Sequence, residues 1–297
     1  MTDQQKKTEE HEDTKKFHIA VGVAVLLCLI LAWQFTSKGG RDKTVDGQSI
    51  LATHKALYNM KLSKISSGMP LTDVSGDMFF EWGEQCDGWT TEHKFSLHYN
   101  YSDKPPVNVK SHYAAFESKN GDEFYFKSDT QRDGMPSEKI KGRIDSVAEG
   151  TKQAIYSFPE GVTFKLPEKF FLPSSHTVEF IKRAKAGEQF FNAILFDGTD
   201  AEGPVEVNAF IGKEVADFGY LEGLPEDVDR TLLNTRAWPV RLAFYNLKAQ
   251  EEVPSYEMNI ILHDNGVISK LDIDYQKFSV KQRLAALEPL EVKKCEE

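Results

Sequence analysis

The clearest pattern in the chain is an alternation of apolar and polar side chains within residues 76–101. Every second residue from Phe95 to Tyr101 is apolar or aromatic, and the residues between them are polar, which is the period of a half-buried β-strand. A second strand pattern precedes it, and the turn-prone residues Cys86, Asp87 and Gly88 separate the two. We therefore predict a hairpin here, around which the rest of the domain is built.

Similar patterns recur along the chain. Further strands are predicted at residues 112–117, 123–127, 153–158, 162–166, 189–196, 204–211, 238–245, 256–263 and 267–275. Asn120 and Gly121 form a dipeptide that favours a tight hairpin. Residues 132–138 are polar and predict a loop, whereas residues 50–62 have a looser apolar pattern that fits either a helix or an extended entry.

One helix is predicted after Leu172. Ser174 or Ser175 would cap it, and Gly187 would end it. Its apolar stripe consists of Val178, Phe180, Ile181 and Ala184. Ten or more antiparallel strands with one helix predict a mainly β fold, either a barrel or a strongly coiled sheet that encloses the helix.

The N-terminal part has a different composition. Residues 1–16 are polar and of mixed charge, and we expect them to be disordered. Residues 17–35 are a signal peptide or a transmembrane anchor: their length is intermediate, and the only candidate cleavage site, around Lys38, is weak. We favour an uncleaved helix in the inner membrane, with release after cleavage as the alternative. Residues 36–49 form a linker, and residues 50–297 form one β domain.

Charge and cysteine content narrow the possible environments. The net charge is −10, and residues 1–43 carry seven basic against six acidic side chains, so the domain is strongly acidic, which argues against nucleic acid as a partner. The basic residues flanking the apolar segment slightly favour a domain outside the cytosol. Of the three cysteines, Cys28 lies inside the apolar segment. Cys86 and Cys295 are then either a pair, in an oxidising compartment, or two unpaired thiols.

Candidate chemistry is sparse. The sequence contains no phosphate loop, dinucleotide fingerprint or serine elbow, and neither a cofactor nor a metal site is expected. The eight histidines are scattered, and solvated or core roles explain them better than metal binding does. His176 at the helix start could help to bind an anion, although capping explains it adequately. Asp272 and Asp274 share one strand face, where a solvated outer surface is the simpler interpretation.

Several motifs together resemble the EipB-like cell-envelope integrity family. They are HKALY at 54–58, EWGEQCDGWT at 81–90, FESKNGDEFYF at 116–126, LPSSHT at 172–177, FDG at 196–198, WPV at 238–240, YEM at 256–258, DNGV at 264–267 and the terminal Cys295. The resemblance implies a periplasmic spiral β-barrel around a helix and a disulfide between Cys86 and Cys295. It also implies a role in maintaining the bacterial envelope, and a barrel similar to those of lipoprotein carriers.

Two functions from different classes follow. The first is a non-enzymatic module that binds a lipid, a lipoprotein or an envelope protein, because a barrel of this size can hold an apolar ligand. The second is an envelope hydrolase that uses Cys86 or a His and acid pair. No catalytic residue is assigned, and the pattern sets neither the ligand nor the oligomeric state. Leu284, Leu287 and Leu290 are expected to form an apolar tail that would fray unless a Cys86–Cys295 bond held it.

Overall fold

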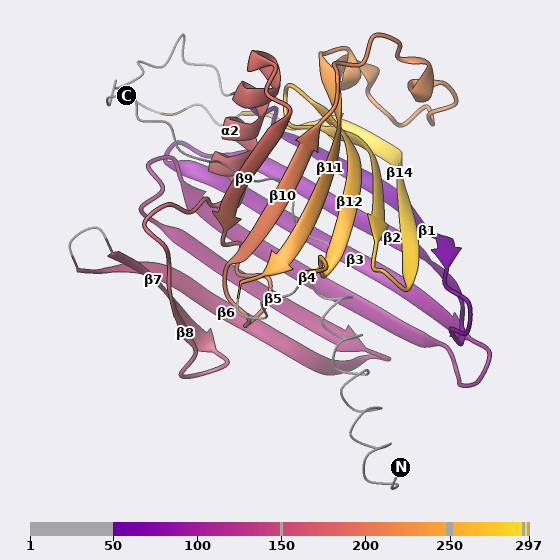
Figure 1. The fold of residues 1–297 in the computed structure, drawn as a ribbon, viewed down its shortest axis with the longest axis horizontal. Helices are drawn as coiled ribbons and strands as arrows, with labels where there is room; N and C mark the ends of the chain where they lie inside the picture. The colour runs from indigo at the N-terminus through magenta and orange to yellow at the C-terminus, as the bar shows by residue number, and fades with distance from the viewer. Residues whose placement is uncertain (1–49, 149–150, 248–251, 293–294, 296–297) are drawn as a thin grey trace, which may run out of the picture.

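The computed structural model describes residues 50–148, 151–247, 252–292 and 295. They form one 14-stranded antiparallel sheet and one α-helix, with two short 3-10 turns (Figure 1). The elements are β1 His54–Ile65, β2 Leu71–Glu84, β3 Gly88–Tyr101, β4 Val107–Ser118, β5 Phe124–Arg132, β6 Met135–Ala148, β7 Thr151–Phe158, β8 Thr163–Lys165, α2 Pro173–Ala186, β9 Phe190–Leu195, β10 Val205–Ile211, η1 Gly219–Leu221, η2 Arg230–Leu233, β11 Ala237–Asn246, β12 Tyr256–His263, β13 Ile268–Asp274 and β14 Phe278–Pro289.

The first and last strands meet in the middle of the sheet. The spatial order is β8-β7-β6-β5-β4-β3-β2-β1-β14-β13-β12-β11-β10-β9, so β1 lies between β2 and β14. The antiparallel register of β1 and β14 runs from His54 opposite Pro289 to Ile65 opposite Phe278. This pairing joins the strands β1–β8 and the strands β9–β14 into one sheet. The two edge strands of the sheet are β8 and β9.

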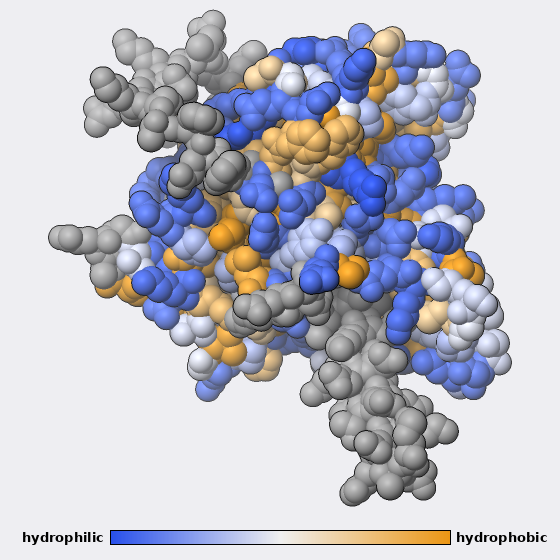
Figure 2. All heavy atoms as spheres, in the orientation of Figure 1, coloured by the Kyte–Doolittle hydropathy of each residue, from blue (hydrophilic) through white to orange (hydrophobic). Residues whose placement is uncertain are grey.

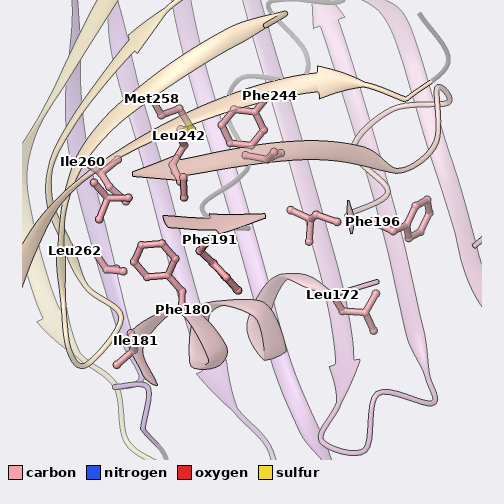
Figure 3. Packing of buried hydrophobic residues seen from close by; sticks show 14 of the residues in the cluster. Leu172, Phe180, Ile181, Phe191, Phe196, Leu242, Phe244, Met258, Ile260 and Leu262 are labelled. Atoms are coloured by element: carbon pink, nitrogen blue, oxygen red, sulfur yellow. The ribbon is translucent and has the colours of Figure 1, made fainter. Parts of the chain in front are cut away.

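The sheet coils so that α2 contacts both of its halves. Trp82 of β2 donates a hydrogen bond to the helix, whereas Phe191 of β9 packs edge-on against Phe180 of the helix, with ring centroids 5.8 Å apart. Figure 3 shows Phe180 and Ile181 of α2 beside Phe191 and facing the strands that carry Leu242, Met258 and Ile260. These residues belong to one buried cluster that also includes aromatic side chains of β5. The helix therefore fills the inside of a coiled sheet, as the strand and helix pattern predicts.

A second buried cluster covers the inner face where β1, β2, β3 and β14 meet. Tyr58, Val74, Leu97 and Val280 are among its members, each at most 5% exposed. Full burial of one such side chain stabilises the fold by about 1.5 to 3 kcal/mol. The alternation from Phe95 to Tyr99 in β3 accordingly marks the inner face, as predicted.

Two expectations about strands need correction, and one open alternative is decided. Residues 132–138 are a two-residue turn and the start of β6, because Asp133 and Gly134 adopt positive φ values of 52° and 79° in a tight hairpin between β5 and β6. For residues 50–62, the extended alternative is confirmed and the helix is not, because β1 begins at His54 and includes the rest of this segment. The apolar tail is β14, whose residues Leu284 and Leu287 are buried and which pairs with β1 on one side and β13 on the other. Backbone pairing with β1 and β13, more than the bond at Cys295, therefore holds this segment in place.

Other expectations are confirmed. The helix spans Pro173–Ala186, and Gly187 ends it with a φ of 79°. Residues 256–263 form β12 with the predicted bounds. The predictions for residues 1–16, 17–35 and 36–49 lie outside the described residues. Within the residues that the structure does describe, no helix combines the length and the apolar character needed to cross a bilayer.

Candidate functional site

A cavity of about 120 Å³ lies between the first turns of α2 and the inner face of the sheet. Its walls come from the segment before β1, from β1, β2 and β3, from α2, and from β12, β13 and the turn between them. The lining residues are Leu51, Ala52, His54, Tyr58, Met78, Phe80, Trp82, Thr91, His93, Pro173, Ser174, Thr177, Met258, Leu262, Asn265, Gly266, Ile268 and Leu271. Most of these side chains are apolar, so the cavity favours an apolar occupant.

The helix wall of the cavity is held by a carboxylate from the sheet. Glu117 of β4 accepts hydrogen bonds from the backbone N–H groups of Ser174 at 2.6 Å and Ser175 at 2.7 Å. Leu172 occupies the N-cap position, so neither serine is the cap that the sequence predicts. Burial raises the pKa of Glu117, and the two N–H groups at the positive end of the helix oppose that rise. A long-range contact therefore replaces a local cap.

A second contact fixes the same turn of α2. The indole Nε1 of Trp82 donates a hydrogen bond to Ser174 Oγ at 3.2 Å, and both residues line the cavity. Trp82 also packs against Trp89 of β3, with ring centroids 6.1 Å apart. The position of the helix relative to β2 and β4, and with it the shape of the cavity, thus depends on these polar contacts.

Two histidines lie in the cavity wall. His54 of β1 is 3% exposed, and its Nδ1 lies 2.7 Å from the carbonyl oxygen of Ala52. Its Nε2 is buried without a hydrogen-bond partner among the described residues. Burial lowers the pKa of His54, so the ring is neutral at pH 7. His93 of β3 packs edge-on against Phe80 at 4.7 Å between ring centroids. The imidazole of His54 is therefore a hydrogen-bond acceptor in an apolar wall.

The structure joins Cys86 and Cys295 in a disulfide, with Cα atoms 5.6 Å apart. Cys86 lies in the turn between β2 and β3, and Cys295 lies beyond the end of β14. A bonded cysteine has no thiolate, so in this state Cys86 cannot act as the nucleophile of a hydrolase.

The His and acid pairs that the structure brings together do not form a catalytic site in the cavity. His112 and Glu92 are 2.6 Å apart, but they lie on β4 and β3 outside the cavity lining. His263 lies 2.9 Å from Ser269 Oγ and is fully buried, and burial lowers its pKa to about 4. A buried Ser and His pair of this kind crosslinks β12 and β13, and substrate has no access to it.

Two other candidate groups have structural roles. His176 is buried and stacks on Phe191, and the adjacent helix N–H groups bind the Glu117 carboxylate, which occupies the place of an external anion. Asp272 forms an ion pair with Arg283 across β13 and β14. No group of three or more potential metal ligands occurs among the described residues.

Sequence reasoning missed the cavity and the position of His54 in its wall. His54 is the first residue of β1, a strand whose apolar pattern is weak, so its inward position was not predicted. The contacts of Glu117 and Trp82 with α2 were not predicted because both residues are far from the helix along the chain. The available signal was the parity of β1, because His54 shares a face with Ala56, which is buried. That parity becomes visible only once the segment is known to be a strand.

Comparison with known proteins matches this architecture to one family. The EipB-like family profile matches residues 46–291. The cell envelope integrity protein EipB of Brucella abortus (strain 2308) is 28% identical over 245 residues, which cover 80% of this chain and 84% of that protein.

A solved structure from Brucella abortus, described as a beta-barrel-like protein of domain of unknown function DUF1849, superimposes with a TM-score of 0.73 at 27% identity. The match covers 81% of this chain and 99% of that one. The family profile thus covers most of the chain, the solved structure shares its fold, and the chain belongs to the EipB-like family.

Proposed function

We propose that this protein maintains the integrity of the bacterial cell envelope by binding an apolar ligand, of the lipid class, in the cavity beside α2. The envelope role is supported by membership of the EipB-like family and by the name of the relative from Brucella abortus. The cavity is the observation that supports binding, because apolar side chains from four strands and one helix converge on it. A lipidated protein could present the same kind of acyl chain.

The proposed compartment is the periplasm. The Cys86–Cys295 disulfide supports it, since such bonds persist in oxidising compartments. Residues 17–35 would tether the protein to the inner membrane, with release after cleavage as the alternative. The acidic charge of the chain supports a partner other than nucleic acid.

We propose a non-enzymatic role. The hydrolase alternative would need an accessible nucleophile beside a base, and the two observations nearest to it are a bonded cysteine and the buried contact between His263 and Ser269. Neither supports turnover. The cavity is instead organised as a binding site, with a helix wall held by fixed hydrogen bonds.

Mass spectrometry of the full chain, purified from the membranes of its own cells, tests the binding function. We expect a lipid-class molecule in near-equimolar amount, released when the protein is unfolded. Purified protein that contains no lipid and binds none from added envelope extract would overturn the proposal.

A further inference from the structure

Several hydrogen-bond donors in the cavity wall are already engaged within the protein. The hydroxyl of Tyr58 donates to the carbonyl oxygen of Ile268 at 2.7 Å. The hydroxyl of Thr177 donates to the carbonyl oxygen of Pro173 at 2.9 Å. The indole of Trp82 donates within the wall, as described above. These contacts leave few donors for the oxygen atoms of a ligand.

Donors at the two ends of the cavity wall are also already used within the protein. Asn265 donates from Nδ2 to the carbonyl oxygen of Leu232 at 2.8 Å, and the first free N–H groups of α2 donate to Glu117. No Lys or Arg occurs among the described residues that line the cavity. An anionic headgroup would therefore lose its hydration without gaining a cation, and it would approach the buried carboxyl of Glu117.

His54 presents the opposite preference. Its Nδ1 carries the proton that is donated to Ala52, so Nε2 holds a lone pair and can only accept. That Nε2 is buried and has no partner among the described residues. A buried acceptor without a donor is unfavourable, and a ligand that supplies one donor removes the penalty.

We infer that the cavity selects a neutral apolar molecule that carries a hydroxyl group, with the hydroxyl donating to His54 Nε2, over an anionic lipid of the same chain length. This selectivity rests on the proposed function, since it concerns the ligand of the same cavity. The chemical class is that of a long-chain alcohol or of an acylglycerol with a free hydroxyl. Discrimination comes from pairing the buried acceptor of His54 and from excluding charge.

The test compares three probes with one chain length: 1-octanol, octyl methyl ether and octanoate. Each is titrated calorimetrically at pH 8 into the full chain held in lipid nanodiscs, and the signal from empty nanodiscs is subtracted. The ether has the same apolar body without a donor, and octanoate is ionised at this pH. One net hydrogen bond predicts that octanol binds about five- to tenfold more tightly than the ether. We expect octanoate to bind more weakly than both.

Two variants locate the selectivity. His54→Phe keeps a ring in the wall and removes the acceptor, so the ratio of octanol to ether affinity should fall to within about twofold of one. His98→Phe is the matched control, because His98 lies on the other face of β3 and bonds to Asn108 there. It should keep the ratio of the unmodified protein.

The outcomes separate the two proposals. Equal affinity for octanol and ether, or tightest binding of octanoate, refutes the selectivity and leaves the proposed binding function standing. No binding of any probe, together with no lipid in the purified protein, refutes the binding function itself. The probe comparison in the unmodified protein decides the selectivity even if His54→Phe does not fold.

Discussion

Removal of the Cys86–Cys295 bond should weaken the domain without releasing its last strand. The bond spans 209 positions. Loop-closure entropy for a loop of this length is worth about 5 kcal/mol, and engineered or natural bonds commonly realise about 2 to 4 kcal/mol of it. That is a large part of the net stability of many domains.

The structure indicates that breaking the bond lowers the free energy of unfolding without loosening β14 in the folded protein. β14 pairs with β1 and β13, and Leu290 exchanges hydrogen bonds with Thr53 beyond its end. The bond therefore acts mainly by restricting the unfolded chain, and the native sheet does not need it to hold β14 in place. Protease sites exposed in Cys86→Ser should lie only after Leu290.

Urea unfolding followed by tryptophan fluorescence measures the effect. With a slope of about 3 kcal/mol per M, the expected loss lowers the midpoint by about 1 M in Cys86→Ser, in Cys295→Ser and in the double variant alike. Because the single variants break the same bond, their effects should not add. Additive losses, or cleavage within β14, would refute this reasoning. Two reactive thiols in protein taken from its native compartment would refute the bond itself.

The remaining predictions concern buried groups of the fold. Glu117→Ala leaves two helix N–H groups unpaired and should cost about 2 to 4 kcal/mol in urea unfolding, with weaker octanol binding. Burial raises the pKa of Asp200 to about 8, so the folded protein favours the protonated carboxyl and its stability falls as pH rises from about 4 to about 8. Asp200→Asn should flatten this pH dependence and add about 2 kcal/mol of stability near pH 8. An unchanged pH dependence in this variant would contradict the prediction. Gly198→Ala places a methyl group against the ring of Phe126 at a φ of 66°, so it should lose more stability than Gly121→Ala. The added methyl group at Gly121 meets open space, and that variant loses only about 1 to 2 kcal/mol for its left-handed backbone.

The local pattern predicted those strands whose two faces differ in polarity. β3 and β12 alternate cleanly, and their hairpin turns carry glycine or asparagine. β6 was missed because its inward residues Ile140 and Ile144 lie among lysine, arginine and glutamate, and because the Asp133-Gly134 turn before it resembles a loop. Tertiary pairing decides such a strand, whereas local sequence does not.

For the candidate site, the sequence could predict the general kind of ligand but not the cavity or the residues that line it. The aromatic content and the coiled sheet indicate an apolar interior, and the family resemblance indicates an envelope protein. The cavity itself depends on contacts between distant segments: the distance from Glu117 to Ser174 along the chain is 57 residues, and Trp82 lies 92 residues from the same serine. Periodicity within one element carries no information about such contacts, so the sequence could not place His54 beside α2.

The central claim is that the cavity is needed for envelope integrity, and one measurement tests it most directly. Cells that lack the protein are supplied with the unmodified chain, with Thr91→Trp, which fills the cavity, or with Ser96→Trp, which adds the same bulk to an exposed position of the same strand. Survival is then measured in a membrane-active detergent at equal protein levels. The account predicts that the unmodified chain and Ser96→Trp restore survival and that Thr91→Trp does not. Full restoration by Thr91→Trp would contradict it.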